Sequence, residues 1–286
     1  MLLKSSVSRS ARPAVLGGAR LRYTVDPAIG TQLKSQWVRP PLHLAKAYAE
    51  KGWAVSLLTS PTAGLLEGDK LEVDVAVDSG SKVGLISPAA CRVHTMDQGN
   101  ALIEQSYKVG PGALLDVWPS PLILQKESRL EQSTRVAVTS DSVLLFCEVV
   151  SPGRAAYGES FAFAQWKSRL QIFRDKKLVA FENFTCSPQN GDLMDWREQY
   201  PDGSYASFYF LAPFPMEDLV ESLHQIQCKE ASIGASPLRE GGMGIKILAA
   251  DGLHLREAVF LVRKMCYEVI GIKLPHALRR AQTFFH

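Results

Sequence analysis

Residues 60–80 read SPTAGLLEGDKLEVDVAVDSG, and this stretch decides the fold. In its second half, acids alternate with the apolar residues Leu71, Val73, Val75 and Val77. Alternation with a period of two is typical of a β-strand with one buried face and one wet face. The Pro- and Gly-rich first half places a carboxylate, Asp69, at the entrance of this strand. Such an acid is often a turn residue, and a role in a functional site is the alternative.

The same pattern continues from about residue 21 to residue 211. Short apolar or alternating runs include KVGLISPA, ALLDVWP, SVLLFCEVV and KLVAFENFT. Between such runs lie turn sequences, among them DSGSK, VGPGA, TSDS and RDKK. Because no helical period separates these strands, the sequence predicts an all-β body, an open stack of mostly antiparallel strands.

Two helices are predicted after this body, near residues 215–228 and 253–271. The first begins PMEDL, and its proline and acids suit the first turn of a helix. The second has apolar residues at steps of three and four, namely Leu255, Val259, Val262, Cys266 and Val269. We expect both helices to pack on the β body, so that residues 21–286 form a single β-rich scaffold domain.

Composition restricts the classes of partner. The chain has 286 residues, of which 46% are hydrophobic and 21% charged, so it can bury a sizeable core. Its net charge of +3 comes without a run of Lys or Arg, which argues against nucleic acid as a partner. No apolar stretch approaches the ~20 residues that cross a membrane. Five widely spaced cysteines suit reduced thiols in a cytoplasmic protein.

The N-terminal segment is basic and rich in serine. Lys4, Arg9, Arg12, Arg20 and Arg22 precede the first acid of the chain. This composition resembles an organelle transit peptide, which is one reading. We favour the other, a flexible basic leader over residues 1–20, because RLRYTV at residues 20–25 already has the character of a strand.

The sequence lacks the strong catalytic and metal-binding signatures. It contains no HExxH, CxxC, GxSxG or HxH motif. Cys91 and His94 form a close Cys/His pair in AACRVHTMD, but a divalent metal ion needs further ligands. Positions three apart in a strand also face opposite sides, so a buried cysteine and a surface histidine are the alternative.

Three carboxylates stand out in the predicted strands and turns: Asp69, Glu159 in YGESF, and Glu182 in LVAFENF. An acid at an inward position of a strand costs several kcal/mol unless it is paired or wet. Glu182 therefore needs water or a partner, and Arg154 or Arg92 is a candidate for an ion pair. The residues alone leave structural and functional roles equally open.

Five segments resemble, in order and spacing, the landmarks of the UreD family of urease accessory proteins, called UreH in some bacteria. They are SPTAGLLEGDKLEVDVAV, ISPAACRVH, PGALLDVWPSPLIL, VVSPGRAAYGESF and LVAFENFT. The resemblance covers residues 37–184 well and the C-terminal helices more weakly. It implies an open, β-helix-like stack with two helices and a role that is not enzymatic.

The resemblance also implies partners and a cargo. The chain is expected to join apo-urease to the helical accessory protein UreF and, through UreF, to the nickel-carrying GTPase UreG. No cofactor is expected to bind stably, and nickel is expected only in transit. Asp69 and Glu182 correspond to acids proposed to line an internal route for nickel or water, with Arg92, Arg154 and Glu159 as candidate supporting residues.

The chain departs from the family pattern in two places. The usual GGxVxGD reads AGLLEGD, and the usual TKVY or SKFY reads CRVH, with His94 in place of tyrosine. The second change makes Cys91 and His94 candidates for an added nickel contact. The alternative function is a carboxylate-based β-helix hydrolase or lyase that acts on polysaccharide, since stacked β proteins often present paired acids.

Overall fold

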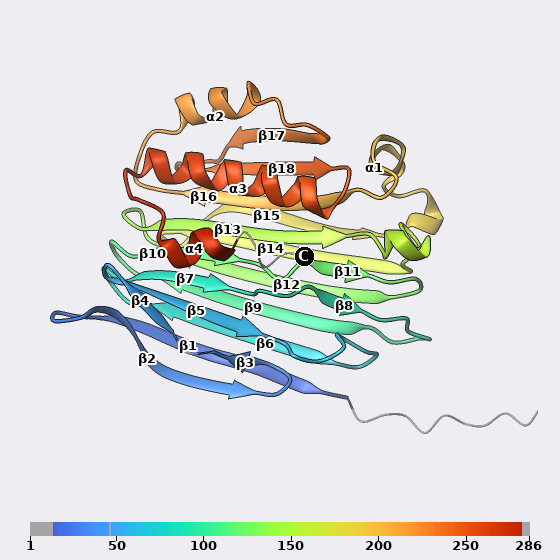
Figure 1. Ribbon diagram of the computed structural model, residues 1–286, viewed down its shortest axis with the longest axis horizontal. Coiled ribbons are helices and arrows are strands. Elements are labelled where there is room, and N and C mark those ends of the chain that lie inside the picture. The colour runs from blue at the N-terminus through green and yellow to red at the C-terminus, as the bar shows by residue number, and fades with distance from the viewer. Residues whose placement is uncertain (1–13, 46, 282–286) are drawn as a thin grey trace, which may run out of the picture.

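The computed structural model describes residues 14–45 and 47–281, and its strands stack into a two-sided solenoid (Figure 1). One side is a seven-stranded sheet in the order β15-β14-β12-β9-β6-β1-β2. Its strands are β1 (Leu16–Asp26), β2 (Gly30–Arg39), β6 (Lys70–Val77), β9 (Ala101–Val109), β12 (Arg129–Val138), β14 (Gln165–Arg174) and β15 (Lys177–Cys186).

The other side is an eleven-stranded sheet with the main order β17-β18-β16-β13-β10-β7-β5-β3. These strands are β3 (His43–Leu44), β5 (Trp53–Thr59), β7 (Lys82–Ile86), β10 (Leu114–Trp118), β13 (Val143–Ser151), β16 (Ser204–Leu211), β17 (Ala231–Pro237) and β18 (Met243–Ala249). The remaining strands of this sheet, off its main path, are β4 (Tyr48–Glu50), β8 (Cys91–Val93) and β11 (Leu122–Leu124).

Successive strands of the body alternate between the two sheets. The connections β6–β7, β9–β10 and β12–β13 occupy residues 78–81, 110–113 and 139–142, so each of these three switches of sheet takes four residues. Strands of adjacent turns then pair in parallel, for example Val75 with Tyr107 and Tyr107 with Val136. Each turn of the solenoid thus places its strands beside the equivalent strands of the turn before.

The solenoid-like stack of strands with C-terminal helices is confirmed, but the predicted antiparallel pairing is wrong for the body. Parallel pairs join β1, β6, β9, β12 and β14 in one sheet and β5, β7, β10 and β13 in the other. Antiparallel pairs lie toward the ends, such as β1–β2 and β14–β15. A four-residue corner between two sheets uses the same Gly, Asp and Ser residues as a hairpin turn, so the turn sequences did not reveal the pairing direction.

Buried hydrophobic side chains form three clusters. The first inner cluster lies between the sheets beside the four-residue corners and includes Tyr23, Val75, Leu115 and Phe146. The second inner cluster lies toward β8 and β11 and includes Leu65, Leu124, Phe163 and Trp166. The third covers the outer face of the eleven-stranded sheet and is shared with the C-terminal helices.

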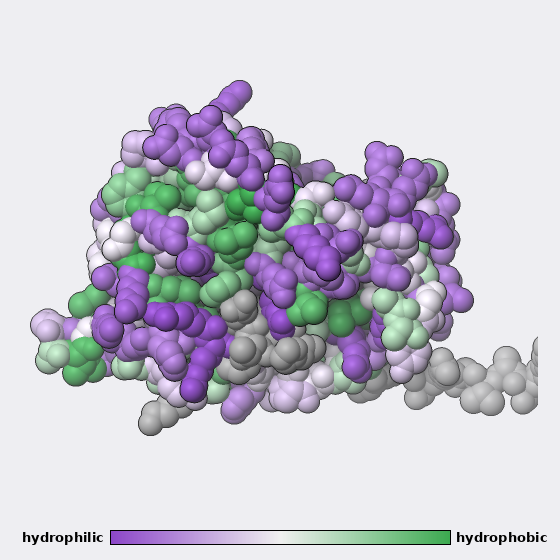
Figure 2. All heavy atoms as spheres, turned by 45° about the horizontal axis from the view of Figure 1, so that its top comes forward, coloured by the Kyte–Doolittle hydropathy of each residue, from purple (hydrophilic) through white to green (hydrophobic). Residues whose placement is uncertain are grey.

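In the described part of the chain, four α-helices accompany the sheets: α1 (Met194–Gln199), α2 (Glu217–His224), α3 (Gly252–Val269) and α4 (His276–Ala281). The two predicted helices correspond to α2 and α3, which lie with α4 over one face of the stack (Figure 1). Most of the predicted apolar stripe of α3 is buried, although Val269 at its end is 36% exposed. On the surface of this region, hydrophobic side chains gather toward the middle and hydrophilic ones border them (Figure 2).

A buried ion pair joins α3 to the solenoid. Arg263 of α3 contacts Asp116 of β10, and both side chains are 0% exposed. Trp118 Nε1 and Tyr267 Oη donate hydrogen bonds to Asp116 Oδ2 at 2.9 and 3.0 Å. Burial lowers the pKa of Arg263 to about 10, which still leaves the guanidinium charged at neutral pH. The outer hydrophobic cluster therefore encloses a buried ion pair that joins α3 to the eleven-stranded sheet.

Three expectations concern the chain as a whole. Residues 1–13 of the predicted leader lie outside the described residues, and β1 begins at Leu16 within its C-terminal part. All five cysteines are free thiols. Within residues 14–45 and 47–281, no helix combines the length and the apolar character needed to cross a membrane.

Candidate functional site

A row of polar side chains crosses the interior between the two inner hydrophobic clusters. On the eleven-stranded sheet its members are Glu148, Ser207 and Lys246, which are paired neighbours on β13, β16 and β18. On the seven-stranded sheet its members are Gln105 and Thr134, paired on β9 and β12, and Glu182 on β15. Each stands at an inward position of its strand, as Glu148 does between Phe146 of one cluster and Val150 of the other. The row therefore follows the stacking axis of the solenoid.

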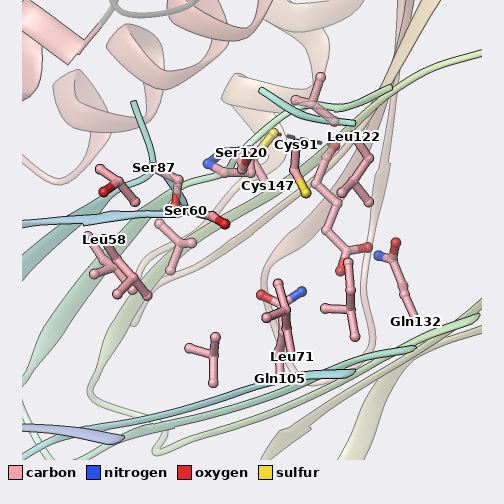
Figure 3. A pocket seen from close by; sticks show the side chains of 18 of the residues that line it. Leu58, Ser60, Leu71, Ser87, Cys91, Gln105, Ser120, Leu122, Gln132 and Cys147 are labelled. Atoms are coloured by element: carbon pink, nitrogen blue, oxygen red, sulfur yellow. Dashed lines mark hydrogen bonds between the residues drawn. The ribbon is translucent and has the colours of Figure 1, made fainter. Parts of the chain in front are cut away.

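A cavity of about 120 Å³ lies at one end of this row (Figure 3). Gln105 lies on one side of it, while Ser60, Ser87 and Ser120, just beyond the ends of β5, β7 and β10, lie on another. The volume exceeds the roughly 10–15 Å³ that one water molecule requires. Gln132, which also lines the cavity, is 2% exposed, and its Oε1 has no hydrogen-bond partner within the described part of the chain. The cavity thus has a mostly apolar wall with a few polar groups, and it is large enough for water.

Glu148 joins this cavity to the rest of the row. It is buried, lines the cavity, and accepts a hydrogen bond from Thr134 Oγ1 at 2.7 Å. Burial raises the pKa of Glu148 above its ordinary value, whereas hydrogen bonds from Thr134 and Gln132 and the charge of Lys246 act in the opposite direction. Since burial dominates, the neutral form of this carboxyl is favoured relative to that of an exposed glutamate.

Glu182 and Lys246 form an ion pair at the other end of the row. Tyr209 Oη donates to Oε1 of Glu182, the same oxygen that Lys246 Nζ contacts. The ammonium also donates to Ser207 Oγ at 2.7 Å. Burial lowers the pKa of Lys246 to about 8. Strands β15, β16 and β18 thus bring one anion, one cation and two hydroxyls together.

The predicted ion-pair partners of Glu182 are wrong, because Lys246 takes that place. Arg154 instead binds Glu159 through two hydrogen bonds, Nη2 to Oε1 at 2.6 Å and Nε to Oε2 at 2.8 Å. This local pair follows β13 and lowers the pKa of Glu159. Arg92 lies on β8 with an exposed side chain. A partner 64 residues away in sequence could not be chosen from local patterns.

Asp69 lies far from Glu182. Their strands, β6 and β15, are four steps apart in one sheet, which at ~4.8 Å per step is roughly 19 Å. Asp69 is 4% exposed, and its oxygens accept hydrogen bonds from the backbone N–H groups of Val15 and Leu66, each at 2.9 Å. Its carboxylate therefore ties the entrance of β6 to the start of β1. Asp69 does not line the cavity, and its place in an internal route stays a prediction.

Cys91 and His94 have different surroundings. Cys91 lies in the second inner cluster and lines the cavity, and burial raises the pKa of its thiol to about 11. The ring Nε2 of His94 is hydrogen-bonded to the carbonyl oxygen of Ala63 at 2.9 Å. No group of three or more His, Cys, Asp or Glu side chains could hold a metal ion among the residues that the structure describes.

The sequence patterns did contain signals for Glu148 and Lys246, the two charged residues of the row that sequence reasoning missed. Glu148 is a lone acid inside the apolar run LLFCEVV, the same signal that singled out Glu182 in LVAFENF. Lys246 interrupts GIKILAA in the same way. The three charged residues of the row, Glu148, Glu182 and Lys246, are therefore each an isolated charge at an inward position of a strand.

Glu148 gives a test of the row that depends on pH. A carboxyl whose pKa is raised by folding stabilises the fold less as pH rises from its unfolded value, about 4.3, through its folded value. Glutamine does not titrate, so Glu148→Gln should gain thermal stability relative to the wild type as pH increases. We expect the difference in Tm to become more positive between pH 5 and pH 7, where Lys246 stays protonated.

Glu131→Gln is the matched control, because Glu131 lies on the outer face of β12 with its side chain 49% exposed. Its Tm difference from the wild type should be the same at both pH values. If Glu148→Gln instead loses stability relative to the wild type as pH rises, then Glu148 is an ionised and well-paired carboxylate in the folded protein.

Comparison with known proteins gives independent evidence on the family to which this chain is similar. The family model described as UreD urease accessory protein matches residues 16–281, from the start of β1 to the end of α4. The urease accessory protein UreD of Opitutus terrae is 35% identical over 247 residues, which cover 83% of this chain and 89% of that protein. UreD of Acetivibrio thermocellus is 26% identical over 243 residues, which cover 83% of this chain and 92% of that protein. UreH of Helicobacter hepaticus is 30% identical over 156 residues, covering 54% and 62%.

Proposed function

Because the chain belongs to the UreD family of urease accessory proteins, we propose that it is the scaffold through which nickel is delivered to apo-urease. In this role it joins apo-urease to a UreF-type helical accessory protein and, through that protein, to a UreG-type GTPase. Nickel is a cargo in transit and no stably bound cofactor is involved. The chain performs no catalysis of its own, in keeping with relatives that are named accessory proteins.

The observation that carries this proposal is the polar row inside the solenoid. It has a carboxylate near the cavity, Glu148, and a second at its other end, Glu182. Nickel prefers imidazole and thiolate ligands, so carboxylate and hydroxyl oxygens hold it more weakly. Weak ligands suit a cation that must leave again, and the row offers them in succession between two hydrophobic clusters.

The size of this cavity argues against polysaccharide hydrolysis or cleavage at Glu148, the alternative function. Small-molecule sites usually enclose about 300–1,000 Å³, whereas this cavity encloses about 120 Å³. A glycosidase also needs two carboxyl groups that flank a bound sugar ring. Glu148 and Glu182 belong to an interior row in which one is buried and the other is paired with Lys246.

Affinity purification from cells that express urease with its accessory proteins tests the scaffold. The tagged chain should recover urease and the UreF-type protein together, and the UreG-type GTPase only when the UreF-type protein is present. Cells without this chain should make urease whose nickel content per active site is at background. Fully nickel-loaded urease in those cells, or recovery of the GTPase without the UreF-type protein, would contradict the proposed role.

A further inference from the structure

The ammonium group of Lys246 lies in a set of oxygen atoms contributed by other strands. It contacts Oε1 of Glu182 on β15, and it donates to Ser207 Oγ at 2.7 Å and to Tyr209 Oη at 3.4 Å on β16. Carboxylate oxygens together with water are ligands that hard cations take in proteins, and the two hydroxyls place further oxygen atoms beside this carboxylate. In this structure the cation that these oxygen atoms contact is the ammonium group of Lys246.

The position of Lys246 is costly for a lysine. Its side chain points inward from β18, beside Leu248 of the second inner cluster, and burial lowers the pKa of the ammonium to about 8. The nearby charge of Glu148 acts in the opposite direction and favours the charged form. The anions of the row therefore help to keep this partly exposed ammonium charged.

The ammonium also lies at the solvent-exposed end of the row. Glu148, which lines the cavity, pairs in register with Ser207, and Ser207 pairs with Lys246. The side chains of Glu182 and Lys246 are 18% and 43% exposed, so water reaches this end of the row. A cation that moves along the row toward this end meets the position that the ammonium holds.

We propose that Glu182, Ser207 and Tyr209 form a divalent-cation site that the tethered ammonium of Lys246 occupies until a passing cation displaces it. This site rests on the proposed nickel route and adds to it the group that closes the route. Lys246 keeps Glu182 neutralised when no cargo is present. It also prevents the carboxylate from holding a divalent cation too tightly for release.

Nickel binding by the tag-free full-length chain tests this site directly. Titration calorimetry with NiCl₂ at pH 7 should show that Lys246→Met binds one more Ni²⁺ per chain than the wild type. If the wild type binds nickel in the row at all, its Kd should be about tenfold or more above the Kd of this site in Lys246→Met. Removing one adjacent positive charge changes cation binding by at least that factor.

Three further variants make the result interpretable. Lys246→Arg keeps the positive charge and should gain no nickel, and the double variant E182Q/K246M should lose the gain. Lys246→Gln is a second neutral variant, and its amide can still donate to Glu182. It should also bind one more Ni²⁺ than the wild type, and it replaces Lys246→Met if Lys246→Met folds poorly. Melting curves establish which variants are folded.

If neither neutral variant binds more nickel than Lys246→Arg, the cation site is refuted. That result is separate from the proposed function, because binding is measured on this chain alone and without urease. Conversely, an added Ni²⁺ in the neutral variants supports the site even if urease receives its nickel by another path.

Discussion

Replacing Arg263 by methionine is expected to lower the free energy of unfolding by about 3–5 kcal/mol, the usual cost of leaving a buried charge without its partner. The partner is Asp116, which is 0% exposed and would keep only the hydrogen bonds from Trp118 and Tyr267. Because Arg263 also packs with its Cζ 4.1 Å from the ring centre of Trp118, part of the loss comes from packing.

Urea or thermal unfolding of the full-length chain measures this effect. Lys264→Met is the matched control, since Lys264 is the next residue of α3, its side chain is 62% exposed, and it lies 3.9 Å from Glu268. Its expected change is about 0–0.5 kcal/mol, as for other exposed pairs on a helix. The double variant D116L/R263M removes both charges and should recover part of the lost stability. Equal stability of Arg263→Met and Lys264→Met would show that the buried pair does not anchor α3.

The second large effect is expected in urease itself. The double variant E148Q/E182Q should lower the nickel content per urease active site by about tenfold or more. A unit charge near a cation contributes several kcal/mol at the effective dielectric constant of a protein, and 1.4 kcal/mol corresponds to a factor of ten. Glutamine keeps the shape of glutamate and one acceptor oxygen, so the main change is the loss of two negative charges, one of them the partner of Lys246.

Co-expression with urease and the other accessory proteins allows nickel per active site and recovery of the complex to be measured together. Glu131→Gln, on the outer face of β12, should leave both unchanged. E148Q/E182Q should lower nickel loading while the complex is still recovered. Full nickel loading in that variant would end the route through these two residues but leave the scaffold role intact. Loss of the complex would assign Glu148 and Glu182 a structural role.

Local patterns were enough to predict the strand-rich body and two of the helices, α2 and α3. Alternation in residues 71–77 predicted β6, and the apolar steps in residues 253–271 predicted α3, because burial of one face is written into the spacing of apolar residues. The pairing direction was mispredicted, since a corner between sheets and a hairpin use the same residues. Short α1 and α4 lacked enough turns to produce a readable period.

The candidate site shows the same division. The sequence by itself determined that Glu182 is an acid inside an apolar strand and so needs a partner, because an unpaired charge in a core is too costly. Only the tertiary structure decided that the partner is Lys246, and that Glu148 continues the row while Asp69 lies about four strands away. Such partners come from different turns of the solenoid. Their proximity depends on strand register and sheet order, which are properties of the whole stack and leave no mark in the local sequence.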